Sequence, residues 1–270
     1  MTKEELENID DIDMLYDLLD KAYCAETDKG KIKYANKVLE MDKDNVDAKM
    51  IIVNTEKDNI KKLEKINKLL SETTKIMEKE GWFDEEYIGM FWGNIETRPY
   101  MRVRYNKVTT LIKLGRLTES IKECEDLIRL CESDNMAVRY KLLSLYVALE
   151  RFDEAEKLSK KYNIDKTLSM LFPISVMYYK QGEYTKASKL IIKMNKENPS
   201  IIKLLSYGFL EDYLDDGIEI GGYIGGTANE AAAVLVDNAN LLLITNSYID
   251  FYKDVLKKDK KTKQTKTRAK

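Results

Sequence analysis

Three stretches of the chain follow one pattern: LGRLTESIKECEDLI at 114–128, LERFDEAEKLSKKY at 149–162 and QGEYTKASKLIIKM at 181–194. In each stretch, a short turn precedes a large hydrophobic residue, and a small residue follows three positions later. The hydrophobic residues are Leu117, Phe152 and Tyr184. The small residues are Ser120, Ala155 and Ala187, which are 35 and then 32 positions apart. Apolar residues recur at helical spacing after each turn, so the pattern predicts helix pairs in tandem repeats.

A two-helix repeat with a period of about 34 residues is typical of the tetratricopeptide repeat. We therefore predict an all-α fold, a TPR-like right-handed α-solenoid of antiparallel helix pairs. The low proline count and the many Lys, Glu, Leu and Ile residues also favour helix along most of the chain. A solenoid grows by stacking repeats and offers an extended surface, so the pattern indicates a binding protein more than a catalyst.

The repeats fit into a single solenoid over residues 1–256. We expect divergent N-terminal helices at 1–80, clear repeats at 82–214 and C-terminal capping helices at 215–256. Capping boxes of the T-x-x-E type predict helix starts at Thr2 and Thr227, and a glycine-rich turn at 217–226 precedes the second box. Residues 257–270 form a lysine-rich tail that we expect to be disordered.

Longer blocks carry a closer resemblance over residues 82–252. FWGNIETRPYMRVRY at 91–105 and DNMAVRY at 134–140 flank the first repeat, and GGYIGGTANEA at 221–231 precedes the closing helix. The chain resembles prokaryotic tetratricopeptide-repeat proteins of unassigned function that carry a similar W-G-x-x-E-T-R-P-Y-M-R block. The resemblance implies an α-solenoid and supplies no activity.

The composition argues against most catalytic sites. The chain has no histidine, which removes Ser-His and Cys-His pairs and nearly all zinc-site patterns. No phosphate-binding loop motif fits the glycine-rich turn, and the acidic run at 42–53 lacks the glycine and glutamate of a calcium loop. We therefore expect no enzyme activity, no cofactor and no metal.

The chain also lacks the marks of secretion or membrane insertion. Its N-terminus is acidic and has no apolar core, and its longest apolar runs are too short to span a bilayer. Cys124 and Cys131 are too far apart on one helix to be bridged. We expect a cytoplasmic protein with reduced thiols and no membrane association.

Arginine and tyrosine residues gather where the first helix of a repeat begins. In the tetratricopeptide family this part of the first helix faces the concave groove, and both residue types are favoured at binding hot spots. A second interpretation remains open, in which these side chains pack between helix layers. The candidate partner-binding residues are Arg98, Tyr100, Arg102, Tyr105, Arg139 and Tyr140.

Asn106 and Lys141 occupy the places of a carboxylate clamp, but Thr109 and Ser144 replace its second asparagine, so a full clamp is not expected. The preferred function is a protein–protein interaction scaffold that binds a peptide or protein partner in the concave groove. The alternative is a nucleic-acid-associated protein that uses the basic C-terminal tail, in which lysines would contact phosphates without sequence preference.

Overall fold

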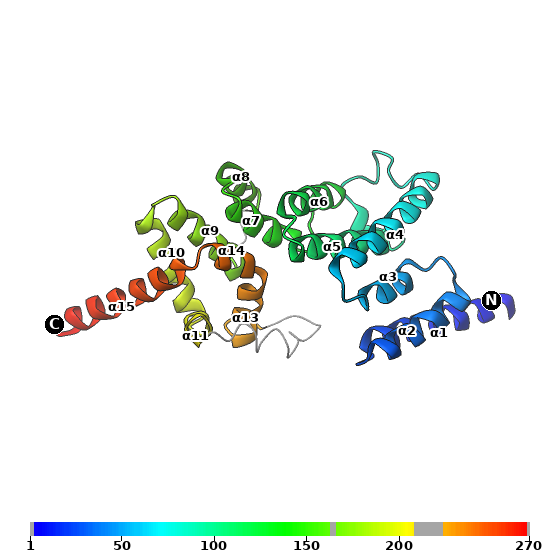
Figure 1. Cartoon of the computed structure of the whole chain (residues 1–270), viewed down its shortest axis with the longest axis horizontal. Helices are drawn as coiled ribbons and strands as arrows, with labels where there is room; N and C mark the ends of the chain where they lie inside the picture. The colour runs from blue at the N-terminus through cyan, green and yellow to red at the C-terminus, as the bar shows by residue number, and fades with distance from the viewer. Residues whose placement is uncertain (1–2, 163–165, 208–223, 269–270) are drawn as a thin grey trace. The chain divides into compact units, whose positions relative to one another are not determined.

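The computed structural model describes residues 3–162, 166–207 and 224–268 (Figure 1). Within these ranges the fold is all-helical, with fourteen α-helices, one short 3-10 helix and no strand. In the same ranges, no helix is both long and apolar enough to cross a membrane. The chain divides into two compact units, residues 1–136 and 137–270, which are described separately.

Unit 1 consists of three consecutive helix pairs. The helices are α1 (Lys3–Cys24), α2 (Asp28–Met41), α3 (Val46–Asn54), α4 (Asn59–Lys79), η1 (Phe91–Gly93), α5 (Arg98–Lys113) and α6 (Leu117–Leu130). Within the pairs, α1 packs on α2, α3 on α4 and α5 on α6. The first helices also touch one another, α1 on α3 and α3 on α5. We call α1, α3 and α5 the first-helix row.

Local sequence signals place the starts of these helices. Thr27, Asn45 and Asp58 are N-caps whose side-chain oxygens accept hydrogen bonds from backbone N–H groups of the first turn. Pro99 lies in the first turn of α5, as its position in the sequence predicts. Before it, the buried Thr97 donates its hydroxyl to the carbonyls of Phe91 and Asn94, which anchors the preceding segment to the start of α5.

Unit 2 begins with two further pairs and continues into helices that fold back on them. The helices are α7 (Val138–Ala148), α8 (Phe152–Lys161), α9 (Leu168–Lys180), α10 (Tyr184–Glu197), α11 (Ser200–Tyr207), α13 (Ala228–Asp237), α14 (Ala239–Ile244) and α15 (Ser247–Arg268). α7 packs on α8, α9 on α10, and α7 on α9. α13 then packs on α7 and α9, α14 on α7, and α15 on α10 and α11.

The helices predicted in the three stretches begin where the pattern places them. The three hydrophobic residues Leu117, Phe152 and Tyr184 are the first residues of α6, α8 and α10. Each preceding turn has the two hydrogen bonds of a Schellman motif, such as Arg116 N–H to the Leu111 carbonyl and Gly115 N–H to that of Ile112. The left-handed residue of the motif is Gly115, Glu150 or Gly182, with φ of 70°, 60° and 76°.

The predicted small residues lie at the helix contacts. Ser120, Ala155 and Ala187 are all fully buried, which lets the second helix of each pair approach the first closely. Ser120 also donates its hydroxyl to the Val108 carbonyl across the α5–α6 contact. The repeated small residue is therefore part of the packing within each pair.

The C-terminal segment differs from expectation in two respects. The apolar helix predicted after Thr227 is divided at the buried Asn238, whose side chain donates to the Val234 carbonyl one turn back. The tail expected to be disordered is helical, because residues 257–268 continue α15. Phe251, Tyr252, Val255 and Leu256 belong to the first half of α15, which packs on unit 2. Adding residues to a helix that is already formed costs little.

The predicted capping box at Thr227 is present in part, because the Glu230 carboxylate reaches the N–H of Gly226 and not that of the N-cap Thr227. The Thr227 hydroxyl oxygen accepts from the Glu230 N–H at 3.3 Å, and the Glu230 carboxylate accepts from the Gly226 N–H at 2.7 Å. Residues 217–223 of the glycine-rich turn and Thr2 of the first capping box lie outside the described residues. None of the three cysteines, all within the described ranges, forms a disulfide, and Cys124 and Cys131 are buried.

Candidate functional site

A small pocket lies on the first-helix row of unit 1. Its volume is about 120 Å³, and residues from α1, α3 and α5 line it together with the last residue of the unit. These residues are Tyr23, Asp47, Met50, Ile51, Asn54, Arg102, Tyr105, Asn106 and Met136. Two of the residues predicted from the sequence, Arg102 and Tyr105, are therefore brought together here.

Arg102 is held by a carboxylate from the neighbouring helix. Its Nε donates to Asp47 Oδ1 at 2.8 Å and its Nη2 to Asp47 Oδ2 at 2.5 Å, a bidentate pair between α5 and α3. Burial alone would lower the pKa of Arg102, but Asp47 outweighs it and raises that pKa above its ordinary value. Asp47 thus occupies the Nε–Nη2 edge of the guanidinium, and Arg102 joins two helices of the row.

Tyr23 brings α1 into the same group. Its hydroxyl donates to Asp47 Oδ1 at 3.5 Å. Partial burial, together with the nearby Asp47 carboxylate, raises the pKa of Tyr23 to about 12. The hydroxyl is therefore a neutral donor at physiological pH, and one carboxylate links all three helices of the row.

Tyr105 and Asn106 form the α5 side of the pocket. The side chain of Asn106 donates to the Arg102 carbonyl one turn back, at 2.9 Å, so the amide is fixed at the pocket wall. Tyr105 is partly buried and lies one turn after Met101 on α5. Because both side chains line the pocket beside the Arg102–Asp47 pair, they are the candidates for contact with a partner.

Arg98 and Tyr100 have a different role. Tyr100 is only 6% exposed, and its ring packs edge-on against Phe83 at 5.7 Å between centroids. Arg98 lies over the Trp92 ring and donates its Nε to the Trp92 carbonyl at 2.9 Å. Neither residue lines the pocket on the row. Both attach the aromatic segment before α5 to that helix, which agrees with the packing interpretation.

Arg139 and Tyr140 belong to unit 2. The Arg139 guanidinium lies 4.4 Å from the centre of the Tyr140 ring and 5.4 Å from that of Tyr162, and it donates to the Tyr140 hydroxyl. This cation–π cluster joins the start of α7 to the end of α8. Both residues are partly buried.

The α7–α9 face of unit 2 is covered by helices of the same chain. α13 packs on α7 and α9, and Lys141 of α7 donates to Asp237 at the end of α13, to its carboxylate at 2.6 Å and its carbonyl at 3.2 Å. In addition, the buried Tyr248 of α15 shares a hydrogen bond with Ser175 of α9 at 2.5 Å. Lys141, the second clamp position considered from the sequence, thus already binds a carboxylate.

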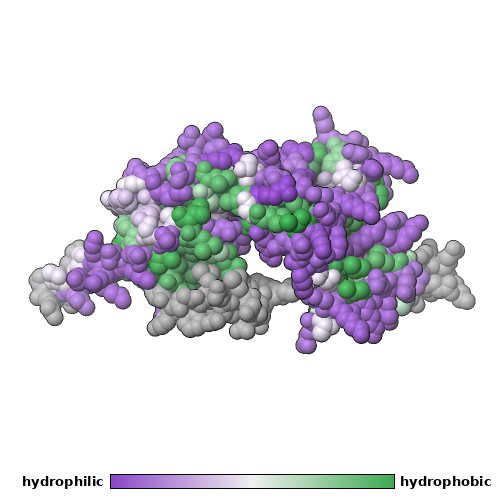
Figure 2. All heavy atoms as spheres, in the orientation of Figure 1, coloured by the Kyte–Doolittle hydropathy of each residue, from purple (hydrophilic) through white to green (hydrophobic). Residues whose placement is uncertain are grey.

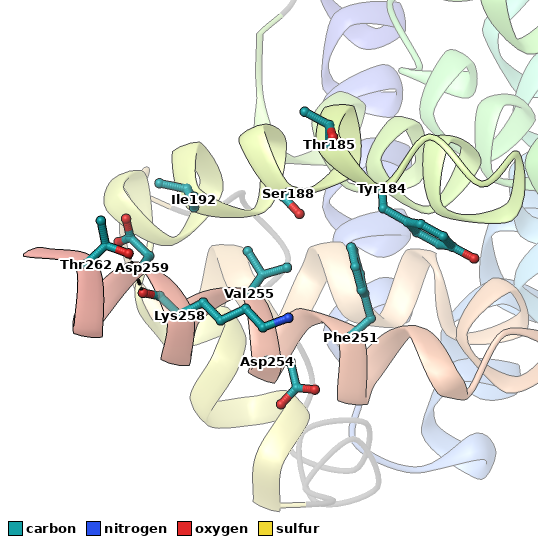
Figure 3. Close-up of a pocket in the computed structure, with 10 residues that line it drawn as sticks. All are labelled: Tyr184, Thr185, Ser188, Ile192, Phe251, Asp254, Val255, Lys258, Asp259 and Thr262. Carbon is teal, nitrogen blue, oxygen red and sulfur yellow. Dashed lines mark hydrogen bonds between the residues drawn. The ribbon is translucent and has the colours of Figure 1, made fainter.

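A larger groove of about 460 Å³ lies between α10 and α15 (Figure 3). The rings of Tyr184 and Phe251 pack against each other at one end of it, tilted and with centroids 5.6 Å apart, and Val255 points from α15 toward α10. Asp254 and Lys258 lie at its α15 edge. The groove combines apolar and hydroxyl side chains with charges of both signs.

The sequence missed several of these residues. Asp47 and Tyr23 contribute to the pocket, but nothing in the local pattern links them to α5, which begins at Arg98, 51 and 75 positions later. Arg104 was also missed. It is partly buried between α5 and α6, where it pairs with Glu123 at 2.8 Å and with Asp126. Its position in the RVRY block was the only available signal.

Among the residues that the structure describes, no group of three or more acidic or cysteine side chains is placed to hold a metal ion. No protein-family model matches the chain, and no curated protein matches it in sequence.

Proposed function

We propose that the chain is a protein-interaction module that binds a peptide or protein partner on a groove of a tetratricopeptide-like solenoid, with the first-helix row of unit 1 as the contact surface. The observation that carries this proposal is the pocket on that row, to which three separate helices contribute side chains. A pocket shared by helices distant in the sequence offers a partner a fixed arrangement of contacts.

The pocket's chemistry suits one anchoring side chain of a partner. Its volume is about 120 Å³. Met50 and Ile51 are buried at its base, whereas Asn54 is exposed. Tyr105 and Asn106 add an aromatic face and a fixed amide. Because Asp47 neutralises Arg102, the pocket favours an uncharged, partly apolar group over a carboxylate.

Unit 2 provides a parallel within the chain. There the face formed by α7 and α9 holds α13 and α14, and a lysine of that face pairs with an aspartate of the bound segment. A row of first helices therefore binds a helical segment in this chain, and we propose that the row in unit 1 does so with a segment of another protein.

The proposal is tested by selecting peptides from a random display library on the full chain and measuring their affinity by calorimetry. We expect Tyr105→Ala to lower the affinity of the selected peptides by about tenfold or more, since aromatic anchors dominate such contacts. Tyr87→Ala is the matched control, because Tyr87 packs on Trp82 and does not line the pocket. The selected peptides should bind the Tyr87→Ala chain as tightly as they bind the unmodified chain.

Two outcomes would count against the proposal. One is that no peptide is enriched over an empty support. The other is that the enriched peptides bind Tyr105→Ala as tightly as the unmodified chain, which would place their site elsewhere.

A further inference from the structure

A second groove, on the opposite flank of α15 from that of Figure 3, carries a concentration of positive charge. Its volume is about 520 Å³. It is lined by Asn195, Pro199, Ile202, Lys203, Lys253, Leu256, Lys257 and Lys260, and we call it the lysine groove. Four of these eight residues are lysines and none is acidic, whereas the groove in Figure 3 has two aspartates at its rim.

The arrangement of these lysines follows from the helix period. Lys253, Lys257 and Lys260 are spaced by four and three residues, so they share one face of α15, and Lys203 lies across from them on α11. All four are exposed, and the surface along this part of α15 is hydrophilic in Figure 2. Like charges at this spacing repel one another, so a negatively charged occupant would relieve the repulsion.

The floor of the lysine groove is apolar. Leu256 is buried there, and Ile202 and Pro199 are at least partly exposed. Such a groove matches a helix that carries apolar anchors beside a row of acids, in the helix-in-groove manner of recognition. A nucleic acid would use the lysines but would leave the apolar floor without a partner.

The described helix that fits this requirement is α1 of the chain itself. It exposes Ile12 and Tyr16, which are 53% and 55% accessible and one turn apart. Asp13 and Asp20 are exposed and lie on the flank of this apolar pair. Leu19 and Ala22, nearer the C-terminal end of α1, pack in the core of unit 1 while Ile12 and Tyr16 stay exposed, so docking would not require α1 to leave its place.

We propose that α1 of one copy docks in the lysine groove of a second copy, with Ile12 and Tyr16 on the apolar floor and Asp13 and Asp20 beside the lysines. Donor and acceptor surfaces are different parts of the chain, so the contact is heterologous. Copies then join head to tail, and each added copy exposes a new α1 and a new groove. This contact does not use the pocket on the first-helix row.

The first test is the mass of the full chain in solution, measured by sedimentation velocity over a wide concentration range. We expect mass to increase with concentration at low salt. The increase should disappear as salt rises from about 0.1 M to about 1 M, which shortens the screening length from about 10 Å to about 3 Å.

Two charge-reversal variants separate the two surfaces. The head variant carries Asp13→Lys and Asp20→Lys, and the groove variant carries Lys253→Glu, Lys257→Glu and Lys260→Glu. Each variant alone should self-associate at least about tenfold more weakly than the unmodified chain, since the reversed charges repel the partner surface. An equimolar mixture should recover association, because the intact α1 of the groove variant fits the intact groove of the head variant and the two reversed surfaces also carry opposite charges. Lys157→Glu, Lys166→Glu and Lys189→Glu make a control of equal charge change outside the groove, which should self-associate normally.

Circular dichroism establishes that each variant is folded. The proposal is overturned if the chain is a monomer at every concentration, or if neither surface variant changes its association. It is also overturned if a single-stranded oligonucleotide binds the unmodified chain, and not the groove variant, while the chain remains monomeric. That result would assign the groove to nucleic acid.

Discussion

At the scale of single residues, the pair of Arg102 and Asp47 has the largest consequence for the row. The guanidinium is about one-third exposed and the carboxylate is 14% exposed, so both groups are partly withdrawn from water. Each charge therefore offsets the cost of withdrawing the other from water. Removing one of them leaves a partly buried charge without its partner. Substituting Arg102 to test partner binding would disturb the contact between α3 and α5 at the same time.

We predict a coupling free energy of about 1–2 kcal/mol between Arg102 and Asp47, because the pair is bidentate and partly buried. The measurement is a double-mutant cycle of Arg102→Ala and Asp47→Ala, followed by urea unfolding. Arg116 and Glu119 form the matched control. They are also bidentate, at 2.6 and 2.5 Å, but nearly half exposed. Their coupling should stay below about 0.5 kcal/mol. Additive single substitutions at Arg102 and Asp47 would contradict this account.

The roles of several individual residues could not be predicted from the sequence. Arg102 and Tyr105 were identified because arginine and tyrosine recur near the start of first helices. Asp47, which decides what Arg102 does, lies 55 positions away and belongs to a different pair. Tyr100 and Arg98 share the residue types of a binding site and yet serve packing, because the aromatic segment before α5 folds onto them.

At the scale of elements, the Schellman turns explain why helix boundaries were predictable. Their hydrogen bonds are local, and two of the three left-handed positions are glycine. The third is Glu150, which adopts φ of 60° although its side chain disfavours this conformation. Its carboxylate is 3.1 Å from Lys180, but Lys180 also donates to the carbonyls of Val147 and Ala148. The lysine therefore keeps partners when Glu150 is replaced.

We predict that Glu150→Gly raises the free energy of unfolding by about 0.5–1 kcal/mol, since relief of the left-handed strain exceeds the added backbone entropy and the lost surface ion pair. Gly182→Ala provides the opposite change. A Cβ at Gly182 meets no atom within 4 Å, so only its conformation is penalised, and stability should fall by about 1 kcal/mol. Urea unfolding measures both, and a Glu150→Gly chain less stable than the original would contradict the argument.

The helical tail shows where element prediction from composition failed. A lysine-rich terminus of low complexity usually stays disordered because it cannot bury apolar area. Here the first half of α15 carries Tyr248, Tyr252 and Val255, which are buried against unit 2 and hold the helix in place. Residues 257–268 continue it. Disorder was inferred from the tail alone, whereas its structure depends on the segment before it.

At the scale of the whole molecule, the periodic pattern predicted helix pairs, and these are present in both units. The sequence did not predict that α13 and α14 would cover the α7–α9 face, because their apolar composition does not specify which surface they pack on. The two faces are therefore used differently: unit 2 holds a segment of its own chain, and we propose that unit 1 accepts a segment from outside.

The most direct test of this central claim is amide hydrogen exchange on the full chain, with and without a peptide selected from the display library. The account predicts that the peptide slows exchange in residues 46–54 and 98–113, which form α3 and α5 of the first-helix row, and leaves α8 unchanged. Slower exchange confined to unit 2, or no change in α3 and α5 at saturating peptide, would contradict the account.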